Sequence, residues 1–188
     1  ATESAIMTAV LAKGETKILN AAREPEVTDL ANCLNKAGAD IKGIGTHILI
    51  INGVKELKKV SHSVVSDRIE AGSFAIASSI TMGDVEINNI NPKNLTEFIN
   101  VLQSTGSKVE IFNNSMRVSS TKRPKPYYVF TNPYPGFPTD LQAQYMALMA
   151  IADGKTLIKE TIFENRFMHV PELNRLGANI TVEKDTAT

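Results

Sequence analysis

The stretch "DVEINNINPKNLTEFINVLQSTGSKVEIF", Asp84–Phe112, decides the fold because two strand patterns flank an amphipathic helix. Apolar residues in the helix follow i, i+3, i+4 and i+7 spacing, which predicts one buried stripe. They are Leu95, Phe98, Ile99 and Leu102. Gly106 follows, and a glycine just past a helix fits a C-cap, where a positive φ costs little without a Cβ. The stretch therefore predicts a strand–helix–strand unit.

This unit occurs three times, at a spacing of about 70 residues, and a helix rich in small residues precedes each copy. Glycines close both kinds of helix. They are Gly14, Gly83 and Gly154 after the small-residue helices, and Gly38, Gly106 and Gly177 after the amphipathic helices. We therefore predict an α/β (α+β) fold built from repeats of helix, strand, helix, strand and strand.

The small-residue helices "AIMTAVLAKG", "FAIASSITMG" and "YMALMAIADG" are apolar almost all round. Such helices are normally buried on every side, so we expect them to pack inside a shell of sheets. The third copy stops at "NITVEKDTAT", Asn179–Thr188, where its last strand should begin. The chain also starts almost directly in a helix, and we therefore expect a fragment of a longer chain with its last repeat incomplete.

Composition limits the possible partners. The 20 basic and 20 acidic residues give a net charge of +0, so nothing attracts nucleic acid or an anionic membrane in general. We interpret the basic run Lys122–Pro126 as a solvated connection between strands. No apolar run approaches the ~20 residues of a membrane-spanning helix. Cys33 is the only cysteine, which favours a reducing, cytoplasmic location.

Motifs for common cofactors do not occur. The sequence has no GxGxxG after a strand, no P-loop and no nucleophile elbow. The histidines are not spaced as metal ligands, and His169 is interpreted as a hydrogen-bonded structural residue. Phosphate groups would have to be bound by scattered Arg, Lys and backbone N–H groups.

Asp140 stands in "FPTDLQAQ", at the start of the third small-residue helix. Thr139–Gln142 fits a capping box, in which a Ser or Thr is followed three residues later by Glu or Gln. From the residues alone, Asp140 is therefore a first-turn acid that the helix dipole stabilises.

The segment "ETIFENRFMHVPEL", Glu160–Leu173, departs from the repeat. When the copies are aligned on their closing glycines, Pro171 falls in the interior of the amphipathic helix. A proline there costs roughly 3 kcal/mol, whereas it is well suited to the first turn. The third amphipathic helix should therefore begin near Val170, and Phe163–His169 should be an irregular segment projecting towards a ligand site.

Several long strings resemble one family of enzymes. They are "NAAREPEVTDLANCLNKAGA", "SDRIEAGSF", "PGFPTDLQAQYMAL" and "IFENRFMHVPEL". They are similar to the UDP-N-acetylglucosamine 1-carboxyvinyltransferases of the EPSP synthase superfamily. The resemblance implies an inside-out α/β barrel of two domains with three repeats each. Residues 1–66 would then be the last repeat of the first domain, and residues 67–188 the first repeats of the second.

The resemblance also implies a reaction. The enolpyruvyl group of phosphoenolpyruvate would pass to the 3-hydroxyl of UDP-N-acetylglucosamine through a tetrahedral intermediate, with release of phosphate and without a metal or organic cofactor. This is the first committed step of peptidoglycan synthesis. One alternative is the shikimate-pathway enolpyruvyl transferase, and another is a non-catalytic repeat module. The family's phosphoenolpyruvate-binding Lys and Arg residues, and the loop with its reactive cysteine, map outside this sequence. We therefore expect the chain alone to be inactive.

The resemblance assigns the candidate site residues. It makes Asp140 the carboxylate that orients the attacking hydroxyl and takes its proton late. It places Ile162 against the UDP-sugar through its main chain, with Phe163 next to it, although core packing remains the alternative for both. Arg166 is a candidate for binding an anion or pairing with a carboxylate such as Glu164, and a structural ion pair fits equally well.

Overall fold

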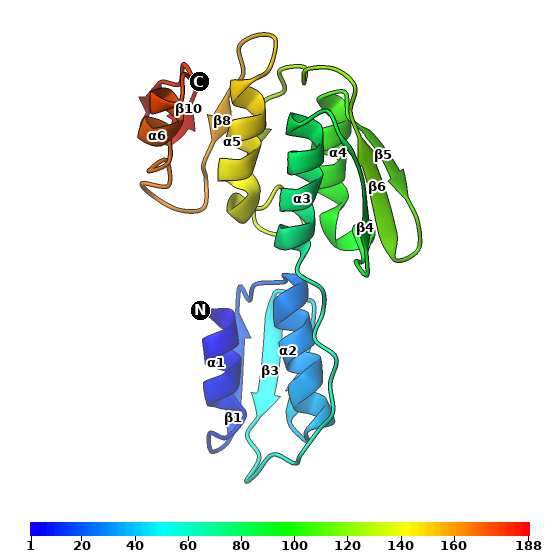
Figure 1. The fold of residues 1–188 in the computed structure, drawn as a ribbon. Helices are drawn as coiled ribbons and strands as arrows, with labels where there is room; N and C mark the ends of the chain where they lie inside the picture. The colour runs from blue at the N-terminus through cyan, green and yellow to red at the C-terminus, as the bar shows by residue number, and fades with distance from the viewer. The chain divides into compact units, whose positions relative to one another are not determined.

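The computed structural model describes all residues, 1–188, and they form two compact units, Ala1–Val65 and Ser66–Thr188 (Figure 1). Each unit has its own hydrophobic core. The assignment of these units to two domains of a longer chain stays a prediction. No helix is both long and apolar enough to cross a membrane.

The first unit contains two helices and one antiparallel sheet with the strand order β1-β3-β2. Its elements are α1 (Thr2–Ala9), β1 (Glu15–Leu19), α2 (Pro25–Lys36), β2 (Asp40–Lys42) and β3 (Ile48–Asn52). Apolar side chains from both helices meet alternate residues of the sheet, so that Ile6, Ala31 and Ile51 are each at most 1% exposed. The predicted stripe of α2 therefore faces the sheet.

The second unit contains two further sheets, with the orders β4-β6-β5 and β7-β8-β10-β9. Its first elements are α3 (Arg68–Ile80), β4 (Asp84–Asn88), the 3₁₀ turn η1 (Pro92–Leu95), α4 (Thr96–Ser104), β5 (Lys108–Ile111) and β6 (Ser115–Ser119). The remaining elements are β7 (Val129–Phe130), the 3₁₀ turn η2 (Thr139–Leu141), α5 (Gln142–Ala150), β8 (Ile158–Lys159), α6 (Val170–Arg175), β9 (Val182–Glu183) and β10 (Thr186–Ala187). Helices α3 and α5 lie side by side in this unit (Figure 1).

The three sheets share one strand order. In each of them the last strand of a copy lies between the first and the second, as in β1-β3-β2, β4-β6-β5 and β8-β10-β9. The third copy has short strands, but it does include the closing strand β10, which the sequence was expected to lack. The reason is that Thr186 and Ala187 pair with both β8 and β9. The sheets do not close into a barrel within these residues.

The small-residue helices are less buried than their composition predicts. Helix α3 buries five small residues and Ile76 along one side, yet Phe74 on the same helix is 55% exposed. In the first unit, Met7 of α1 is 52% exposed. The prediction of burial on every side is wrong for α1 and α3, because no other element of the same unit covers their outer faces.

The predicted ends of the amphipathic helices are confirmed, whereas Gly14 and Gly154 lie beyond the ends of α1 and α5. Gly38, Gly106 and Gly177 all have φ near +100° just after amphipathic helices. Gly83 does not have a positive φ, and Met82 takes the left-handed conformation in its place with φ 51°. Pro171 lies in the first turn of α6, which begins at Val170 as expected, since this position needs no backbone N–H donor.

Candidate functional site

Asp140 lies in η2, immediately before α5, and its side chain is exposed. The following residue, Leu141, is completely buried and holds this turn against α3. The close approach depends on Gly72, because a Cβ there would lie 2.4 Å from Leu141 Cδ1. The packing of two helices thus fixes where the carboxylate of Asp140 stands.

Thr139 does not form the predicted capping box. Its hydroxyl donates to Glu160 Oε2 at 2.8 Å, and the turn has no side-chain cap. Gln142, the other half of the motif, is buried with its side-chain nitrogen lacking a hydrogen-bond partner. The capping-box interpretation is wrong because the Thr139 side chain turns to the Glu160 carboxylate as a donor, whereas a capping box needs its oxygen to accept from a backbone N–H of the helix start.

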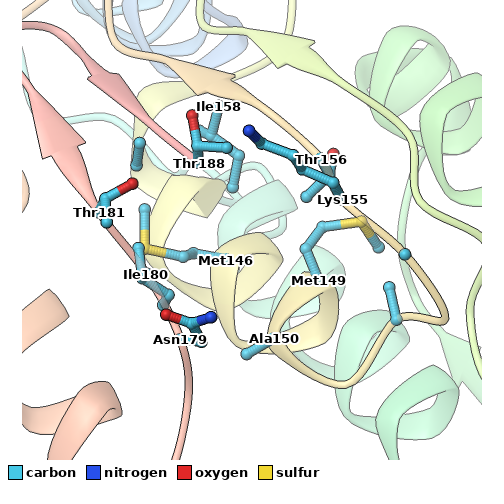
Figure 2. Close-up of a pocket in the computed structure, with 13 residues that line it drawn as sticks. Met146, Met149, Ala150, Lys155, Thr156, Ile158, Asn179, Ile180, Thr181 and Thr188 are labelled. Atoms are coloured by element: carbon cyan, nitrogen blue, oxygen red, sulfur yellow. The ribbon is translucent and has the colours of Figure 1, made fainter.

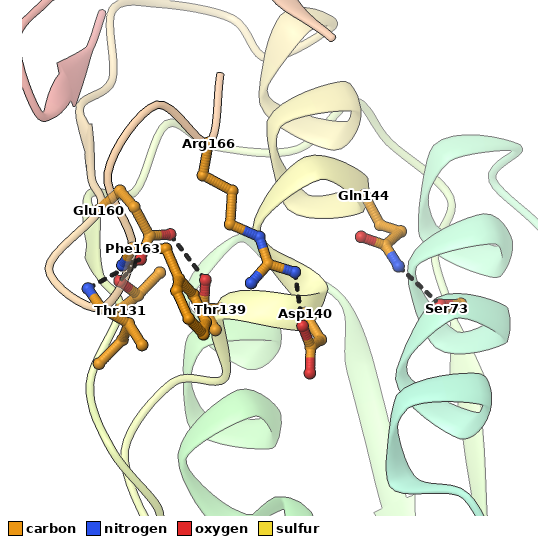
Figure 3. Close-up of polar contacts among 9 residues, drawn as sticks. Ser73, Thr131, Thr139, Asp140, Gln144, Glu160, Phe163 and Arg166 are labelled. Carbon is orange, nitrogen blue, oxygen red and sulfur yellow. Dashed lines mark hydrogen bonds and ion pairs between the residues drawn. The ribbon is translucent and has the colours of Figure 1, made fainter. Parts of the chain in front are cut away.

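Glu160 is the centre of a buried hydrogen-bond cluster and is only 3% exposed. Its Oε1 atom accepts from the Thr131 hydroxyl at 2.9 Å. The same atom accepts from the backbone N–H groups of Ile162 at 2.9 Å and Phe163 at 3.1 Å. With the Thr139 hydroxyl on Oε2, four donors surround the carboxylate, as Figure 3 shows for its threonine partners. A buried carboxylate is tolerated only with such compensation.

The segment after Glu160 is irregular up to α6, as predicted for residues 163–169. Ile162 is half-buried, and its backbone N–H is engaged by Glu160. The ring of Phe163 is 56% exposed, so core packing does not account for it. An exposed aromatic ring on a fixed backbone is suited to contact a ligand.

Arg166 brings two predicted site residues together. Its guanidinium donates to Asp140 Oδ1 at 2.5 Å. The same group lies over the ring of Phe163, with its carbon 5.0 Å from the ring centroid. Figure 3 shows Arg166 reaching from its loop towards Asp140. The carboxylate partner is therefore Asp140 and not Glu164, which was the neighbour suggested by the sequence.

Polar contacts continue across the helices beside the site. Gln144 of α5 donates to the Ser73 hydroxyl of α3 at 3.1 Å (Figure 3). Arg68, at the start of α3, lies over the ring of Tyr134 at 6.0 Å. These contacts connect α3 to α5 and to the segment that leads into η2.

His169 lies apart from this cluster and is a structural residue. Its Nε2 atom is 3.2 Å from Met146 Sδ, and its ring packs edge-on against Phe167. Burial lowers the pKa of His169 from its ordinary value of 6.5. The neutral imidazole is therefore favoured, in keeping with packing rather than with acid–base chemistry.

Two hollows adjoin the third sheet. One of about 530 Å³ is lined mainly by apolar and hydroxyl side chains, with Lys155 as its only ionisable group (Figure 2). It contains none of the predicted site residues. The other, of about 800 Å³, is lined by residues 159–167 with Lys184 and Asp185. It includes Ile162, Phe163 and Arg166, so three of the candidate residues meet at the second hollow, and the fourth, Asp140, pairs with Arg166.

Sequence reasoning missed Glu160 and the role of Thr139. One pattern could have pointed to Glu160, because it stands six residues after Gly154, as Asn20 and Asn89 stand after Gly14 and Gly83. Both asparagines come directly after their strands and have a positive φ, whereas Glu160 does not. A long acidic side chain in place of an asparagine that readily adopts a positive φ indicates that the chain does not make the same tight turn here.

The arrangement can orient and deprotonate a hydroxyl group. Asp140 is an exposed carboxylate immediately before the start of α5. Arg166 can face an anionic ligand, whereas the backbone N–H groups of Thr161, Ile162 and Phe163 are already engaged by Thr131 and Glu160. No group of three His, Cys, Asp or Glu side chains is placed to hold a metal ion.

A family model matches residues 1–188, and its description is EPSP synthase (3-phosphoshikimate 1-carboxyvinyltransferase). UDP-N-acetylglucosamine 1-carboxyvinyltransferase from Geobacter metallireducens is 54% identical over 187 residues, covering 100% of this chain and 45% of the relative. An enzyme from Mesorhizobium japonicum with the same name and the suffix 2 is 53% identical over 183 residues, covering 97% of this chain and 44% of its own. The chain thus spans just under half the length of these curated relatives.

Two solved structures have a similar fold. The enolpyruvyl transferase NikO from Streptomyces tendae superposes with a TM-score of 0.88 at 24% identity, covering 99% of this chain and 45% of that protein. The EPSP synthase from Acinetobacter baumannii gives a TM-score of 0.51 at 13% identity, covering 99% and 43%. At these identities the likeness concerns the fold alone.

Proposed function

This chain belongs to the EPSP synthase family, and we propose that it supplies part of an active site for enolpyruvyl transfer. The donor is phosphoenolpyruvate and the acceptor is the 3-hydroxyl of UDP-N-acetylglucosamine. The observation that carries this proposal is 54% identity, over the whole chain, to relatives named for that reaction. The string "IFENRFMHVPEL", Ile162–Leu173, favours this acceptor over shikimate 3-phosphate.

Asp140 is the residue we assign to the proton. The sugar oxygen forms a bond to C2 of phosphoenolpyruvate while C3 takes up a proton from solvent, and the hydroxyl proton passes to the Asp140 carboxylate. C3 then returns a proton to solvent as the bond from C2 to the phosphate oxygen breaks, which restores the double bond and releases phosphate. A carboxylate is a weak base, so it first orients the hydroxyl and takes the proton late, when the attacking oxygen has become acidic. Its exposure leaves the oxygen that Arg166 does not bind open to an incoming hydroxyl.

The loop after Glu160 is the proposed wall of the sugar-nucleotide site. Ile162 contributes through its backbone, and Phe163 through an exposed ring. Arg166 stands between Phe163 and Asp140 and carries a positive charge to the point where the acceptor would lie. Support comes from the hollow of about 800 Å³ that Ile162, Phe163 and Arg166 help to line.

We also propose that the sheets belong to an inside-out barrel of repeats of about 70 residues. The support is the strand order that the three sheets share and the likeness to two enolpyruvyl transferase structures over 99% of the chain. Residues up to about 66 would belong to one domain and residues from 67 to the next.

Ligand titration of the full-length protein, followed by a phosphate-release assay, tests this function. We expect UDP-N-acetylglucosamine to bind and phosphate to be released when phosphoenolpyruvate is added with it. Release with shikimate 3-phosphate instead would favour the other enolpyruvyl transfer. Binding of neither acceptor would favour a non-catalytic module and would contradict the proposal.

A further inference from the structure

Glu160 joins the two parts of the candidate site, although neither proton transfer nor sugar binding uses it directly. We propose that Glu160 is a positioning residue that fixes the start of the Asp140 turn and the path of the Ile162–Phe163 backbone relative to one another. This inference rests on the proposed function, because that reaction makes the turn a catalytic part and the loop a binding part.

The two carboxylate oxygens of Glu160 accept hydrogen bonds from different segments. Oε2 accepts from the Thr139 hydroxyl and so holds the residue next to Asp140. Oε1 accepts from the N–H groups of Ile162 and Phe163 and so holds the loop. A single rigid group of atoms therefore sets the distance between the proton acceptor and the wall of the sugar site.

The backbone of Glu160 leaves its side chain little freedom to shift. The Glu160 N–H donates to the carbonyl of Asp185 at 2.8 Å, in the turn between β9 and β10. On the next strand, the Thr131 N–H donates to the carbonyl of Lys159 at 3.0 Å, and Thr131 Oγ1 accepts from the Thr161 N–H at 2.8 Å. The carboxylate is thus anchored to a sheet, and rigid elements position reacting groups more accurately than loops do.

A carboxylate suits this position better than an amide. Both oxygens accept, so donors can converge on it from both sides. A glutamine has only one acceptor oxygen, which would stay on the side of the two backbone N–H groups because an amide NH₂ cannot face them. Its NH₂ would then face Thr139, whose hydroxyl would have to become an acceptor. Glu160→Gln therefore disturbs the Asp140 side selectively.

This asymmetry gives a kinetic test on the full-length protein. We expect Glu160→Gln and Thr139→Val each to lower kcat roughly tenfold, with the KM for UDP-N-acetylglucosamine within about threefold, because small misplacements of reacting groups cost this much or more. Glu160→Ala should lower kcat and also raise that KM about tenfold or more. Thr139→Ser keeps the hydroxyl and should restore kcat.

A matched control separates positioning from a general loss of stability. Ser107→Ala removes another buried side-chain hydrogen bond, from Ser107 to Ser79 at 2.9 Å, away from the site. It should lower Tm about as much as Thr139→Val while leaving kcat and KM unchanged. If Thr139→Val changes only Tm, as the control does, Glu160 has a structural role and the inference is wrong.

Amide hydrogen exchange tests the inference without turnover. The N–H groups of Ile162 and Phe163 should be protected in the wild-type protein and in Thr139→Val, but exposed to exchange in Glu160→Ala. If the wild-type protein fails to use UDP-N-acetylglucosamine while this exchange pattern holds, the proposed function is wrong and the geometric role of Glu160 stands. Unchanged protection in Glu160→Ala would overturn the inference itself.

Discussion

The connections after β4 and β8 occupy the same place in the strand order, yet they differ in length and in content. After β4, the chain turns at Asn89, buries Ile90, and begins η1 with Asn91 accepting from the Lys93 N–H. After β8, the chain runs irregularly from Glu160 to the start of α6. The short connection serves the core, whereas the long one holds backbone donors and exposed side chains around a buried carboxylate.

This difference shows how one topology supports both packing and a site. A left-handed asparagine directly follows β1 and β4, and the next residue, Ala21 or Ile90, is buried in the core. At the matching position Glu160 needs four donors to compensate its burial, and the backbone that supplies two of them is held away from a helical path. We therefore expect substitutions around the long connection to change activity, whereas similar substitutions elsewhere in the chain should not.

The largest effect is expected for Asp140→Asn. Removing the proton acceptor should lower kcat about 10²- to 10⁴-fold, the usual contribution of general acid–base catalysis. Asp84→Asn is the matched control, because Asp84 also pairs with an arginine, Arg117, at 2.7 Å and is 48% exposed against 50% for Asp140. Steady-state kinetics should show the control within about twofold of wild type, and similar losses in both variants would contradict the assignment.

The next largest effect is expected for Phe163→Ala. Loss of an aromatic contact worth roughly 1 kcal/mol or slightly more should raise the KM for UDP-N-acetylglucosamine between five- and tenfold. Phe112, beyond the end of β5, is 53% exposed and offers a control of similar exposure. A lower kcat with an unchanged KM would place Phe163 outside the sugar wall.

A smaller effect is expected for Pro171→Ala. Proline in the first turn of α6 restricts the unfolded chain, so its loss should reduce the free energy of unfolding by about 0.4–1 kcal/mol. Pro25→Ala, at the start of α2, is the matched change in the first unit. Denaturant unfolding measures both, and a cost of several kcal/mol at Pro171 alone would mean that the loop depends on this proline.

The smallest effect is expected from His169. Its pKa is lowered by burial, so the unfolded chain binds a proton at a higher pH than the folded chain does. The neutral His169 side chain therefore contributes fully to the free energy of unfolding at pH values above its ordinary pKa of 6.5. This contribution is lost as the pH falls through the pKa of the folded state. An NMR titration should find the imidazole titrating below 6.5, and His169→Phe should remove this part of the pH dependence. Titration above 6.5 would contradict the packing described for it.

The sequence predicted the amphipathic helices and the glycines that end them because these depend on neighbours within one or two helical turns. The late start of α6 follows from Pro171 alone, and glycines mark the ends of α2, α4 and α6. The burial of α1 and α3 was overestimated, since composition does not reveal which faces another element will cover.

The candidate site divides in the same way. The resemblance identified Asp140 and the 162–166 loop, but the capping box assigned to Thr139 was wrong and Glu160 was missed. The partners of Glu160 stand 29 and 21 residues away in the chain at Thr131 and Thr139. No local pattern predicts that their hydroxyl groups meet one carboxylate. The sequence by itself determined which helices and strands form, and only the tertiary structure decided where Glu160 is buried, because a charge leaves water only where the folded chain brings enough donors to it.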